Sequence, residues 1–385
     1  MDVLGFITEY KWVILFYILI ILFITAKRDK FTFQAKFIAL YKTKIGLKLI
    51  DRIGTKHSEF IKILGYIGIG IGYAGMLFIL YFIVKGVYDL VFVPGAPAVV
   101  APVLPGVHIP GSPIFVPFWY GIAALFIVVL IHEFSHGIVA KAHGLPVLNS
   151  GIVFFGPLIG AFVEPDEKKM KKESDVVQYS IFAAGPFSNI LLAGLVILIV
   201  IAVFNPIANA YVHPIGVSFT EVTPGMPADL AGLKPGVVYN RVNNITVNST
   251  YEFISAFDNI GVGERVIIAN EDSEYQVVTT SKEEEPGKPV IGVNLETRYQ
   301  NDDSDLMKLF FIIVELFSWI FMLSLGLGLA NLLPIGPVDG GRMIQVSLSK
   351  VMGEKKGNRV WTKLTIFMVG IIIILVITPI IRALI

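Results

Sequence analysis

The sequence predicts a polytopic α-helical membrane protein of about six transmembrane helices, with an extracytoplasmic α+β domain inserted between the fourth and the fifth. The first observation is composition: 55% of the 385 residues are hydrophobic and only 16% are charged, which is rare in soluble globular proteins. The second is a set of apolar segments long enough to span a bilayer. The third is a more polar stretch, residues 206–305, which is long enough to fold on its own.

Six apolar segments qualify as transmembrane helices. They comprise residues 12–26, 63–84, 118–139, 179–204, 309–333 and 364–384. The first is at the lower limit of length. We interpret it as a retained helix and not as a signal peptide, because the acidic residues Asp2 and Glu9 precede it and no small-residue cleavage site stands before Lys27 and Arg28.

Loop charges predict the orientation of these helices. Residues 27–62 carry ten Lys or Arg residues, whereas residues 88–117, rich in Pro and Gly, carry none. Because positively charged loops remain in the cytoplasm, the first loop is expected inside and the second outside. Alternation along the chain then places both termini and the insertion at 206–305 outside the cell membrane.

The insertion has the pattern of a small α+β domain. Strands are expected at 217–222, around Val242, and at 265–269, 275–280 and 290–295, with one helix at 250–260. This pattern resembles a PDZ domain of the kind found beside bacterial proteases, which implies a prokaryotic plasma membrane. The resemblance rests on the sequence AGLKPG at 231–236 and on Asn243 and Asn244 at the next turn, although Val237 stands where an aspartate is usual.

Charge and cysteine content narrow the possible chemistry. The 31 Lys and Arg residues nearly balance the 30 Asp and Glu residues, and no dense basic stripe alternates with aromatic residues, so nucleic acid is not an expected partner. The chain has no cysteine. Disulfides, iron–sulfur clusters and thiolate ligands are therefore excluded, and any metal must be bound by His, Asp, Glu or water.

The third apolar segment contains an ionisable motif, His-Glu-Phe-Ser-His, at 132–136. Ionisable side chains at membrane depth are costly and mark functional sites. Four residues advance an α-helix by about 400°, so the imidazoles of His132 and His136 lie on one face and can share one metal ion. Glu133 lies beside them and can take a proton from a water molecule that the ion activates. This arrangement is typical of zinc hydrolases.

Two further motifs lie in or at the end of predicted membrane helices. Residues 185–189 read Gly-Pro-Phe-Ser-Asn, and residues 331–340 read Asn-Leu-Leu-Pro-Ile-Gly-Pro-Val-Asp-Gly. The three motifs, in this order and with the PDZ-like insertion between the last two, resemble the site-2 protease family of intramembrane zinc metalloproteases over residues 60–345. Four parts are then expected: 1–62 with the first helix and the basic loop, 63–205 with the first two motifs, the PDZ-like domain at 206–305, and 306–385 with the third motif and the last helix.

The resemblance assigns roles at the metal. It implies one Zn²⁺ ion bound by His132, His136 and Asp339, with Glu133 as the general base. The segment before Asp339 contains Pro334 and further helix-breaking residues, which must end the fifth helix and free the carboxylate to turn toward the bundle. Two imidazoles and a carboxylate leave one position of a tetrahedral ion open for water.

The two asparagines of these motifs are expected to serve the substrate. By the same resemblance, Asn189 faces the site as a catalytic or substrate-binding residue that holds substrate or the oxyanion, and Asn331 binds substrate in a similar way. For Gly185 and Pro186 we favour a helix kink and a close helix contact over a chemical role. Outside its motif, Asp339 would be interpreted as an ordinary helix cap.

Four other ionisable residues are not assigned to the metal. His143 stands one position too far along the chain to be a third histidine ligand and is expected at the membrane interface. Glu315 either lines a path to the site or, as we favour, extends to the interface. His108 and His213 lie in outer segments.

Residues 145–165 form an apolar loop interrupted by Pro and Gly, so a spanning helix is not expected there. We predict a re-entrant hairpin beside the active site. The resemblance implies that its extended edge pairs with an unwound substrate, since a peptide bond inside a helix is closed to attack. The alternative is a membrane-surface loop that only seals the bundle.

The function implied is hydrolysis of a peptide bond within or near a transmembrane segment of a single-span membrane protein. Another protease can first cut this substrate on the outer side of the membrane. Membrane lipid is the other expected partner. The PDZ-like domain either binds the new C-terminal carboxylate or excludes substrates with large ectodomains. Two other classes of protein predict different sequences: a silent scaffold predicts a degraded motif, and a transporter predicts a repeat of the His-Glu pattern, which is not found.

Overall fold

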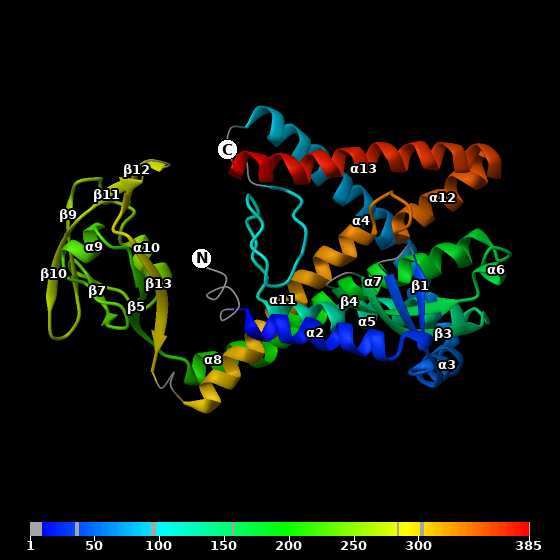
Figure 1. The fold of residues 1–385 in the computed structure, drawn as a ribbon, viewed down its shortest axis with the longest axis horizontal. Coiled ribbons are helices and arrows are strands. Elements are labelled where there is room, and N and C mark those ends of the chain that lie inside the picture. Colours follow the sequence, from blue (N-terminus) through cyan, green and yellow to red (C-terminus); the bar gives the residue numbers. More distant parts are fainter. Residues whose placement is uncertain are drawn as a thin grey trace. The chain divides into compact units, whose positions relative to one another are not determined.

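The computed structural model describes residues 10–34, 38–93, 98–155, 158–282, 285–300 and 304–384. The chain forms two compact units (Figure 1). Unit 1 comprises Met1–Leu198 and Glu315–Ile385, and unit 2 comprises Ile199–Val314. The insertion expected at 206–305 therefore belongs to unit 2.

Long apolar helices dominate the chain. Within the described residues, five helices are long and apolar enough to cross a membrane. They are α4 (Ser58–Phe92), α5 (Phe118–Ala142), α7 (Asp175–Ile199) with its continuation through η2 (Val200–Phe204) and α8 (Asn205–Tyr211), α11 (Asp305–Asn331) and α13 (Glu354–Leu384). The first predicted segment forms α2 (Lys11–Ala26), a helix of only 16 residues. The prediction of a polytopic helical membrane protein is confirmed.

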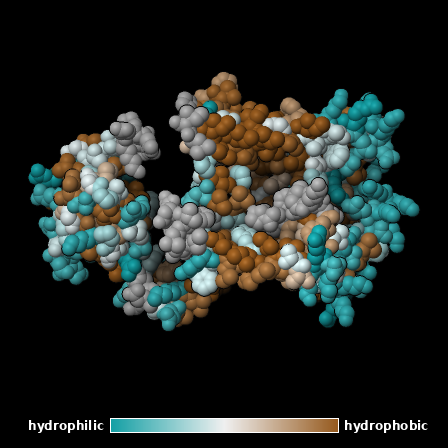
Figure 2. Space-filling view, viewed as in Figure 1, coloured by the Kyte–Doolittle hydropathy of each residue, from teal (hydrophilic) through white to brown (hydrophobic). Residues whose placement is uncertain are grey.

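Unit 1 has a polar end. The shorter helices α3 (Leu47–Lys56), α6 (Glu167–Met170) and α12 (Asp339–Met352) lie at this end, whose surface is hydrophilic, whereas the long helices α4 and α13 are covered by apolar side chains (Figure 2). The end carries lysines that the charge pattern assigns to the cytoplasm, among them Lys48 in α3 and Lys168 in α6. Unit 1 therefore has a hydrophilic end next to long apolar helices, and the side of the membrane that this end faces stays a prediction.

Helix α4 approaches α7 closely through glycines. A Cβ atom placed on Gly65 would lie 3.2 Å from the Cβ of Ser180, and one placed on Gly68 would lie 3.3 Å from the ring of Phe187. Small residues let membrane helices pack backbone against backbone, where apolar lipid tails give no net drive for association. This contact fixes α7, which carries the motif at 185–189.

An antiparallel sheet of four strands lies beside α5. Its order is β1 (Phe31–Gln34), β2 (Ile38–Thr43), β3 (Val147–Phe155) and β4 (Leu158–Pro165). The hairpin predicted at 145–165 is β3 with β4, and its turn at 156–157 lies outside the described residues. The sequence interpretation missed β1 and β2, which lie in the basic loop. β2 pairs with β3, β1 pairs with β2, and both pack on α2 through a cluster that includes Phe31, Ala39 and Phe154.

Helix α11 ends at Asn331 and α12 begins at Asp339, so the predicted break of the fifth helix is confirmed. The chain turns sharply here because Gly340 and Gly341 lie against the backbone carbonyls of Leu332 and Ile335, where no Cβ atom would fit. α12 itself was not predicted. It packs on α13, and the indole of Trp361 donates a hydrogen bond to Gly341 O at 2.8 Å.

Unit 2 is a small α+β domain with three sheets. A three-stranded sheet has the order β13 (Val293–Tyr299), β5 (Pro214–Val222) and β6 (Val238–Tyr239). A four-stranded sheet has the order β10 (Glu274–Val278), β9 (Arg265–Ala269), β7 (Arg241–Val242) and β8 (Ile245–Thr246). The strands β11 (Thr280–Lys282) and β12 (Glu285–Val290) form a pair. The short helices α9 (Pro227–Leu230) and α10 (Thr250–Ser255) lie between the strands along the chain, and unit 2 also includes η2, α8 and the first residues of α11.

These elements follow most of the sequence predictions for the insertion. The strand expected at 265–269 is β9, whereas the helix expected at 250–260 ends at Ser255. The strand expected at 290–295 is divided, because Gly292 has φ +82° and turns the chain between β12 and β13. The core is formed by large side chains with almost no exposure, including Phe219, Tyr239 and Ile268.

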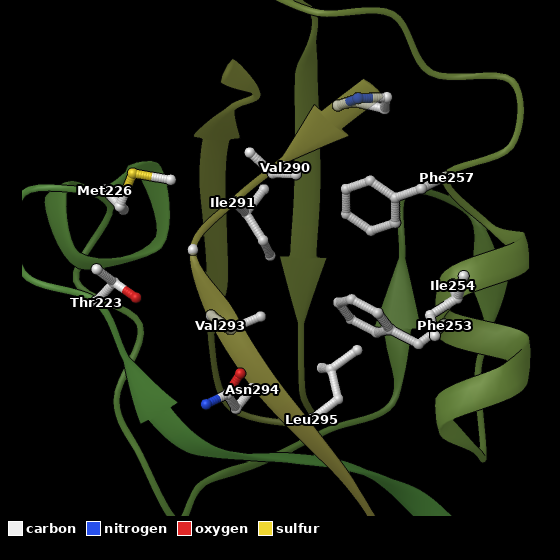
Figure 3. Close-up of a pocket in the computed structure, with 12 residues that line it drawn as sticks. Thr223, Met226, Phe253, Ile254, Phe257, Val290, Ile291, Val293, Asn294 and Leu295 are labelled. Carbon is white, nitrogen blue, oxygen red and sulfur yellow. The ribbon is translucent and has the colours of Figure 1, made fainter. Parts of the chain in front are cut away.

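A pocket of about 480 Å³ lies between α10 and β13 in unit 2 (Figure 3). One wall is formed by Phe253, Ile254 and Phe257, in or just after α10. The opposite wall is formed by residues of the turn at Gly292 and by Leu295 of β13. Because β13 is at the edge of its sheet, the pocket runs beside a strand with one side open to pairing.

Candidate active site

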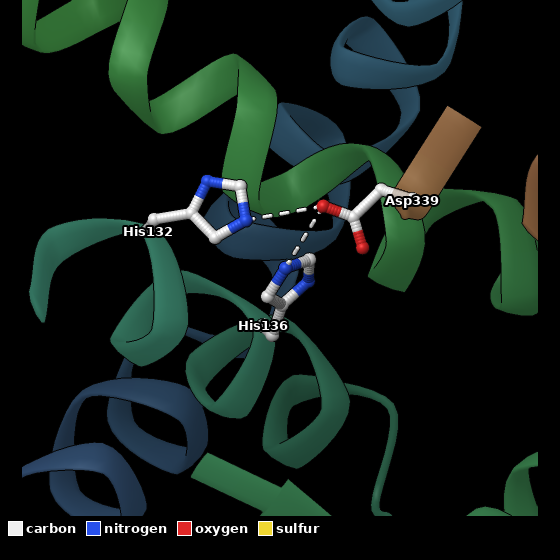
Figure 4. A group of neighbouring side chains, drawn as sticks. All are labelled: His132, His136 and Asp339. Atoms are coloured by element: carbon white, nitrogen blue, oxygen red, sulfur yellow. Dashed lines mark hydrogen bonds and ion pairs between the residues drawn. The ribbon is translucent and has the colours of Figure 1, made fainter. Parts of the chain in front are cut away.

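The two histidines of the motif at 132–136 lie on one face of α5, as their spacing predicts (Figure 4). His132 is only 4% exposed, and its ring centroid lies 4.9 Å from that of His136. The Nε2 atoms of both rings point to the same carboxylate oxygen, Oδ2 of Asp339, at 3.1 Å from His132 and 3.4 Å from His136. Residues 207 positions apart thus converge on one point.

Asp339 is held at the start of α12 by the tight turn at Gly340 and Gly341. Burial raises the pKa of this carboxyl group, but the charge of His136 and the hydrogen bonds from both imidazoles lower it by more. The net pKa therefore lies below the ordinary value for aspartate, and the group is an ionised carboxylate. An ionised carboxylate and two imidazole nitrogens are the ligand types that zinc prefers in the absence of thiolates.

Because Gly185 has no side chain, there is space for an ion beside the Nε2 atoms of His132 and His136. A Cβ atom on Gly185 would lie 2.5 Å from His132 Nε2 and closer still to His136 Nε2, so only a glycine can face these nitrogens. The ligand atoms of His132, His136 and Asp339 all lie within 4.8 Å of one another. Zinc binds such ligands at about 2.0–2.2 Å. The donors and the space beside Gly185 fit a single zinc ion.

The Nδ1 atom of each imidazole faces away from Asp339. When Nε2 binds a metal, Nδ1 carries the proton and needs an acceptor. His136 Nδ1 lies 2.7 Å from the carbonyl oxygen of Ile181, to which it donates. His132 Nδ1 lies 3.2 Å from the side-chain amide of Asn189, which is fully buried. Asn189 thus contacts the back of a histidine, and its predicted contact with substrate stays a prediction.

Glu133 is positioned by the sheet. Its Oε2 accepts a hydrogen bond of 3.3 Å from the backbone N–H of Val163 in β4. This N–H points away from β3, so it belongs to the outer edge of the sheet, and β4 lies close to α5 because Gly137 leaves room for Val163. The predicted general base and the strand edge expected to bind substrate are therefore in direct contact.

The remaining residues singled out in the sequence lie elsewhere. Asn331 donates to Leu327 O in its own helix at 3.1 Å, and its predicted role in substrate binding stays a prediction. His143 Nε2 lies 3.0 Å from Ser180 Oγ, and burial followed by the charge of Lys62 lowers its pKa. His143 therefore contacts α7 through Ser180, and it is not part of the group formed by His132, His136 and Asp339.

Sequence reasoning missed two contributions to the site. Gly185 was interpreted as a helix contact, and it is one, but the partner it contacts is the pair of Nε2 atoms. The carbonyl of Ile181 carries no sequence signal, because any residue supplies a backbone carbonyl. Pro186 marks this turn of α7 but not the acceptor, because the backbone hydrogen bond that a proline at 186 removes is the one to Phe182 O, one residue after Ile181.

Comparison with known proteins agrees with this geometry. The model of peptidase family M50 matches residues 120–377, which include all three motifs. An uncharacterized protein of Methanocaldococcus jannaschii, MJ0971, is 26% identical over 312 residues, covering 78% of this chain and 75% of that protein. The chain belongs to peptidase family M50, the site-2 protease family, as its three motifs predicted.

Membership and fold together define the class of protein. The chain is a membrane metalloprotease of a zinc-dependent family, and its His-His-Asp group is the arrangement that such an enzyme requires.

Proposed function

We propose that this metalloprotease hydrolyses a peptide bond within or near the transmembrane segment of a single-span membrane protein, as in regulated intramembrane proteolysis. The observation that carries the proposal is the position of the site. His132 and His136 belong to α5, which is 25 residues long and apolar enough to cross a membrane, and Asp339 joins them from the first turn of α12, after the chain leaves another such helix, α11, at Asn331. A substrate for this site has to be presented at membrane depth.

The chain's own residues supply positioning and proton transfer. Zinc, when bound by His132, His136 and Asp339, supplies a Lewis acid for the scissile carbonyl and for the attacking water. Glu133 takes a proton from that water and later gives it to the leaving amine. Its carboxylate is held by Val163 N–H at the outer edge of β4, so a substrate segment that adds to this edge lies beside the base. The edge also holds the segment extended, with its peptide bonds accessible.

Metal dependence is the first test of this function. The purified chain is expected to cleave a single-span model substrate, to lose cleavage in a zinc chelator and to regain it when zinc is returned. Asp339→Ala is expected to lose stoichiometric zinc and cleavage together, because two imidazoles alone hold the ion weakly. Zinc content by mass spectrometry of the metal and cleavage by gel assay measure both effects.

Asp51→Ala is the matched control, since Asp51 is an exposed carboxylate that pairs with Lys141 outside the site. It should keep zinc and cleavage. Cleavage that persists in the chelator would exclude a metalloprotease mechanism for this chain, and stoichiometric zinc in Asp339→Ala would place the third ligand elsewhere.

Unit 2 is proposed to be a PDZ-like gate on the extracytoplasmic side. The pocket beside β13 supports this proposal, because an extended peptide can pair with the open edge of β13 while its last side chain enters an apolar pocket. Binding a C-terminus there would favour substrates already cut outside by another protease. A filter against large ectodomains is the second form that the gate can take.

Removing the strand-containing part of unit 2, residues 214–299, is expected to admit substrates that have not been cut beforehand. His213 O accepts a hydrogen bond of 2.8 Å from Gln300 N, so residues 214–299 can be deleted and the two ends joined by a short linker without strain. The measurement is the ratio of cleavage rates for uncut and pre-cut forms of one substrate, with and without the deletion. An unchanged ratio would mean that unit 2 is not the gate.

Ile254→Asp separates the two forms of the gate. Ile254 lines the pocket and is 58% exposed, so the charge should not unfold the domain. Binding of a C-terminus predicts slower cleavage of the pre-cut substrate, whereas a size filter predicts no change. Tyr251→Asp is the control, because Tyr251 is 78% exposed on the same helix and does not line the pocket.

A further inference from the structure

The side chain of Asn189 is enclosed between the helices α7 and α11. The side chain is fully buried, and its backbone carbonyl accepts a hydrogen bond of 2.8 Å from Ser324 Oγ in α11. A Cβ atom on Gly328 would lie 3.2 Å from the Cβ of Asn189, so α7 and α11 close over it. In this structure the side chain of Asn189 therefore contacts its protein neighbours, and a role that acts through them can be examined apart from its predicted contact with substrate.

The neighbour that matters is His132. Both Nε2 atoms of the histidine pair face Asp339, so both Nδ1 atoms must carry a proton when a metal is bound. His136 donates this proton to Ile181 O. The equivalent proton of His132 points at Asn189, whose amide nitrogen stands 3.2 Å away. An amide nitrogen is a donor, and two donors facing each other make no hydrogen bond.

The other end of the same amide resolves this conflict. Asn189 Oδ1 is buried and has no hydrogen-bond partner. The oxygen and nitrogen of a carboxamide have nearly the same size and shape, so a half-turn of the group exchanges them without moving its surroundings. After this turn, Oδ1 accepts the Nδ1 proton of His132, and the buried oxygen is satisfied.

We propose that Asn189 is a positioning residue for the metal site: its side-chain oxygen accepts the Nδ1 proton of His132, which fixes the ring with Nε2 toward the metal. Ile181 O does the same for His136, so α7 supplies the acceptor for both histidines of α5. The proposal rests on zinc binding by the site under the proposed function, and it gives Asn189 a role that is separate from contact with substrate.

Two substitutions of opposite character test this role in the full-length protein. Asn189→Leu keeps the volume and removes the acceptor, and Asn189→Asp keeps the acceptor. Groups that orient metal-binding histidines are worth about 10–100-fold in metal affinity. We expect Asn189→Leu to weaken zinc binding by about that factor and Asn189→Asp to stay near the wild-type affinity, both measured by competition with a chromogenic chelator.

A residue that only fills space gives the reverse order. In a tight interface between apolar helices, leucine would keep the zinc affinity and a buried aspartate would lower it. That order overturns the proposal, as does equal affinity in all three proteins. The melting temperature of the metal-free chain is the parallel measurement, since the proposal requires that Asn189→Leu lose zinc affinity without loss of metal-free stability.

Two further variants separate the loss of the acceptor from a general effect on α7 or on folding. Ser188→Ala removes the polar group next to Asn189 in the chain, whose hydroxyl donates to Gly185 O in its own helix, and it should leave the zinc affinity unchanged. Should Asn189→Leu not fold, Asn189→Ala removes the same acceptor and is expected to show the same loss. Failure of the wild-type chain to bind zinc would refute the metal site itself, whereas wild-type binding with full affinity in Asn189→Leu refutes only the role of Asn189.

Discussion

Glu133→Gln is expected to abolish cleavage of a membrane substrate while leaving zinc bound. Glutamine has the shape of glutamate and still offers an oxygen to Val163 N–H, but it cannot take a proton from water. General base catalysis contributes about 10²–10⁴-fold to the rate, so cleavage should fall by that factor. Initial cleavage rates and the zinc content of the same preparation provide the measurement.

Glu164→Gln is the matched control for this substitution. Glu164 follows Val163 on the same strand, but its carboxylate is bound by Lys42 at 2.9 Å and by Asn149 at 2.8 Å, away from the metal ligands. These hydrogen bonds, that of Lys42 first, hold the pKa of Glu164 below its usual value. We expect its cleavage rate to remain close to wild type. A Glu133→Gln enzyme with full activity would require another base.

Gly185→Ala is expected to abolish zinc binding, an effect as large as the loss of a ligand. The added methyl group would lie 2.5 Å from His132 Nε2 and nearer to His136 Nε2, within the space where a bound ion must sit. Either the methyl group excludes the ion or α7 moves away and separates His136 from Ile181 O and His132 from Asn189. Zinc stoichiometry of the purified variant distinguishes this outcome from a simple change in helix packing.

Gly194→Ala offers the comparison within the same helix. No atom lies within 4 Å of the Cβ position of Gly194 apart from its own helix backbone and chain neighbours, so alanine is accommodated there and raises helix propensity. Zinc and cleavage should both be retained in this variant. Stoichiometric zinc in Gly185→Ala would show that the ion binds on the other side of the histidine pair.

Much of the site could be predicted from sequence because its chemistry is local. Helix geometry places His132 and His136 on the same face of one helix. The prolines before Asp339 indicate that a helix ends there, whatever the tertiary structure. The family resemblance then predicted that these three residues bind the same metal ion. The membrane helices were equally accessible, because a long apolar segment has few alternatives to a spanning helix.

The parts that escaped prediction depend on contacts between distant segments. Strand β2 pairs with β3 across more than a hundred residues, as in the pairing of Leu40 with Val153, and nothing within the basic loop specifies that partner. The role of Gly185 follows from the side of α7 that faces α5. For Asn189, the sequence identifies the residue. Only the buried geometry around His132 indicates which atom of its side chain is needed as a hydrogen-bond acceptor.

The hydrogen bond between His213 and Gln300 brings together the two ends of the segment 214–299. The two ends of the strand pair β5 and β13 meet, with Pro214 opposite Tyr299, so the segment between them leaves and re-enters the chain at nearly one point. Domains whose termini adjoin are the ones that genomes can insert into or excise from another gene without disturbing the host fold. Residues 214–299 therefore have the connectivity of an exchangeable domain, whose removal or replacement would leave the chain joined at the same point on either side of it.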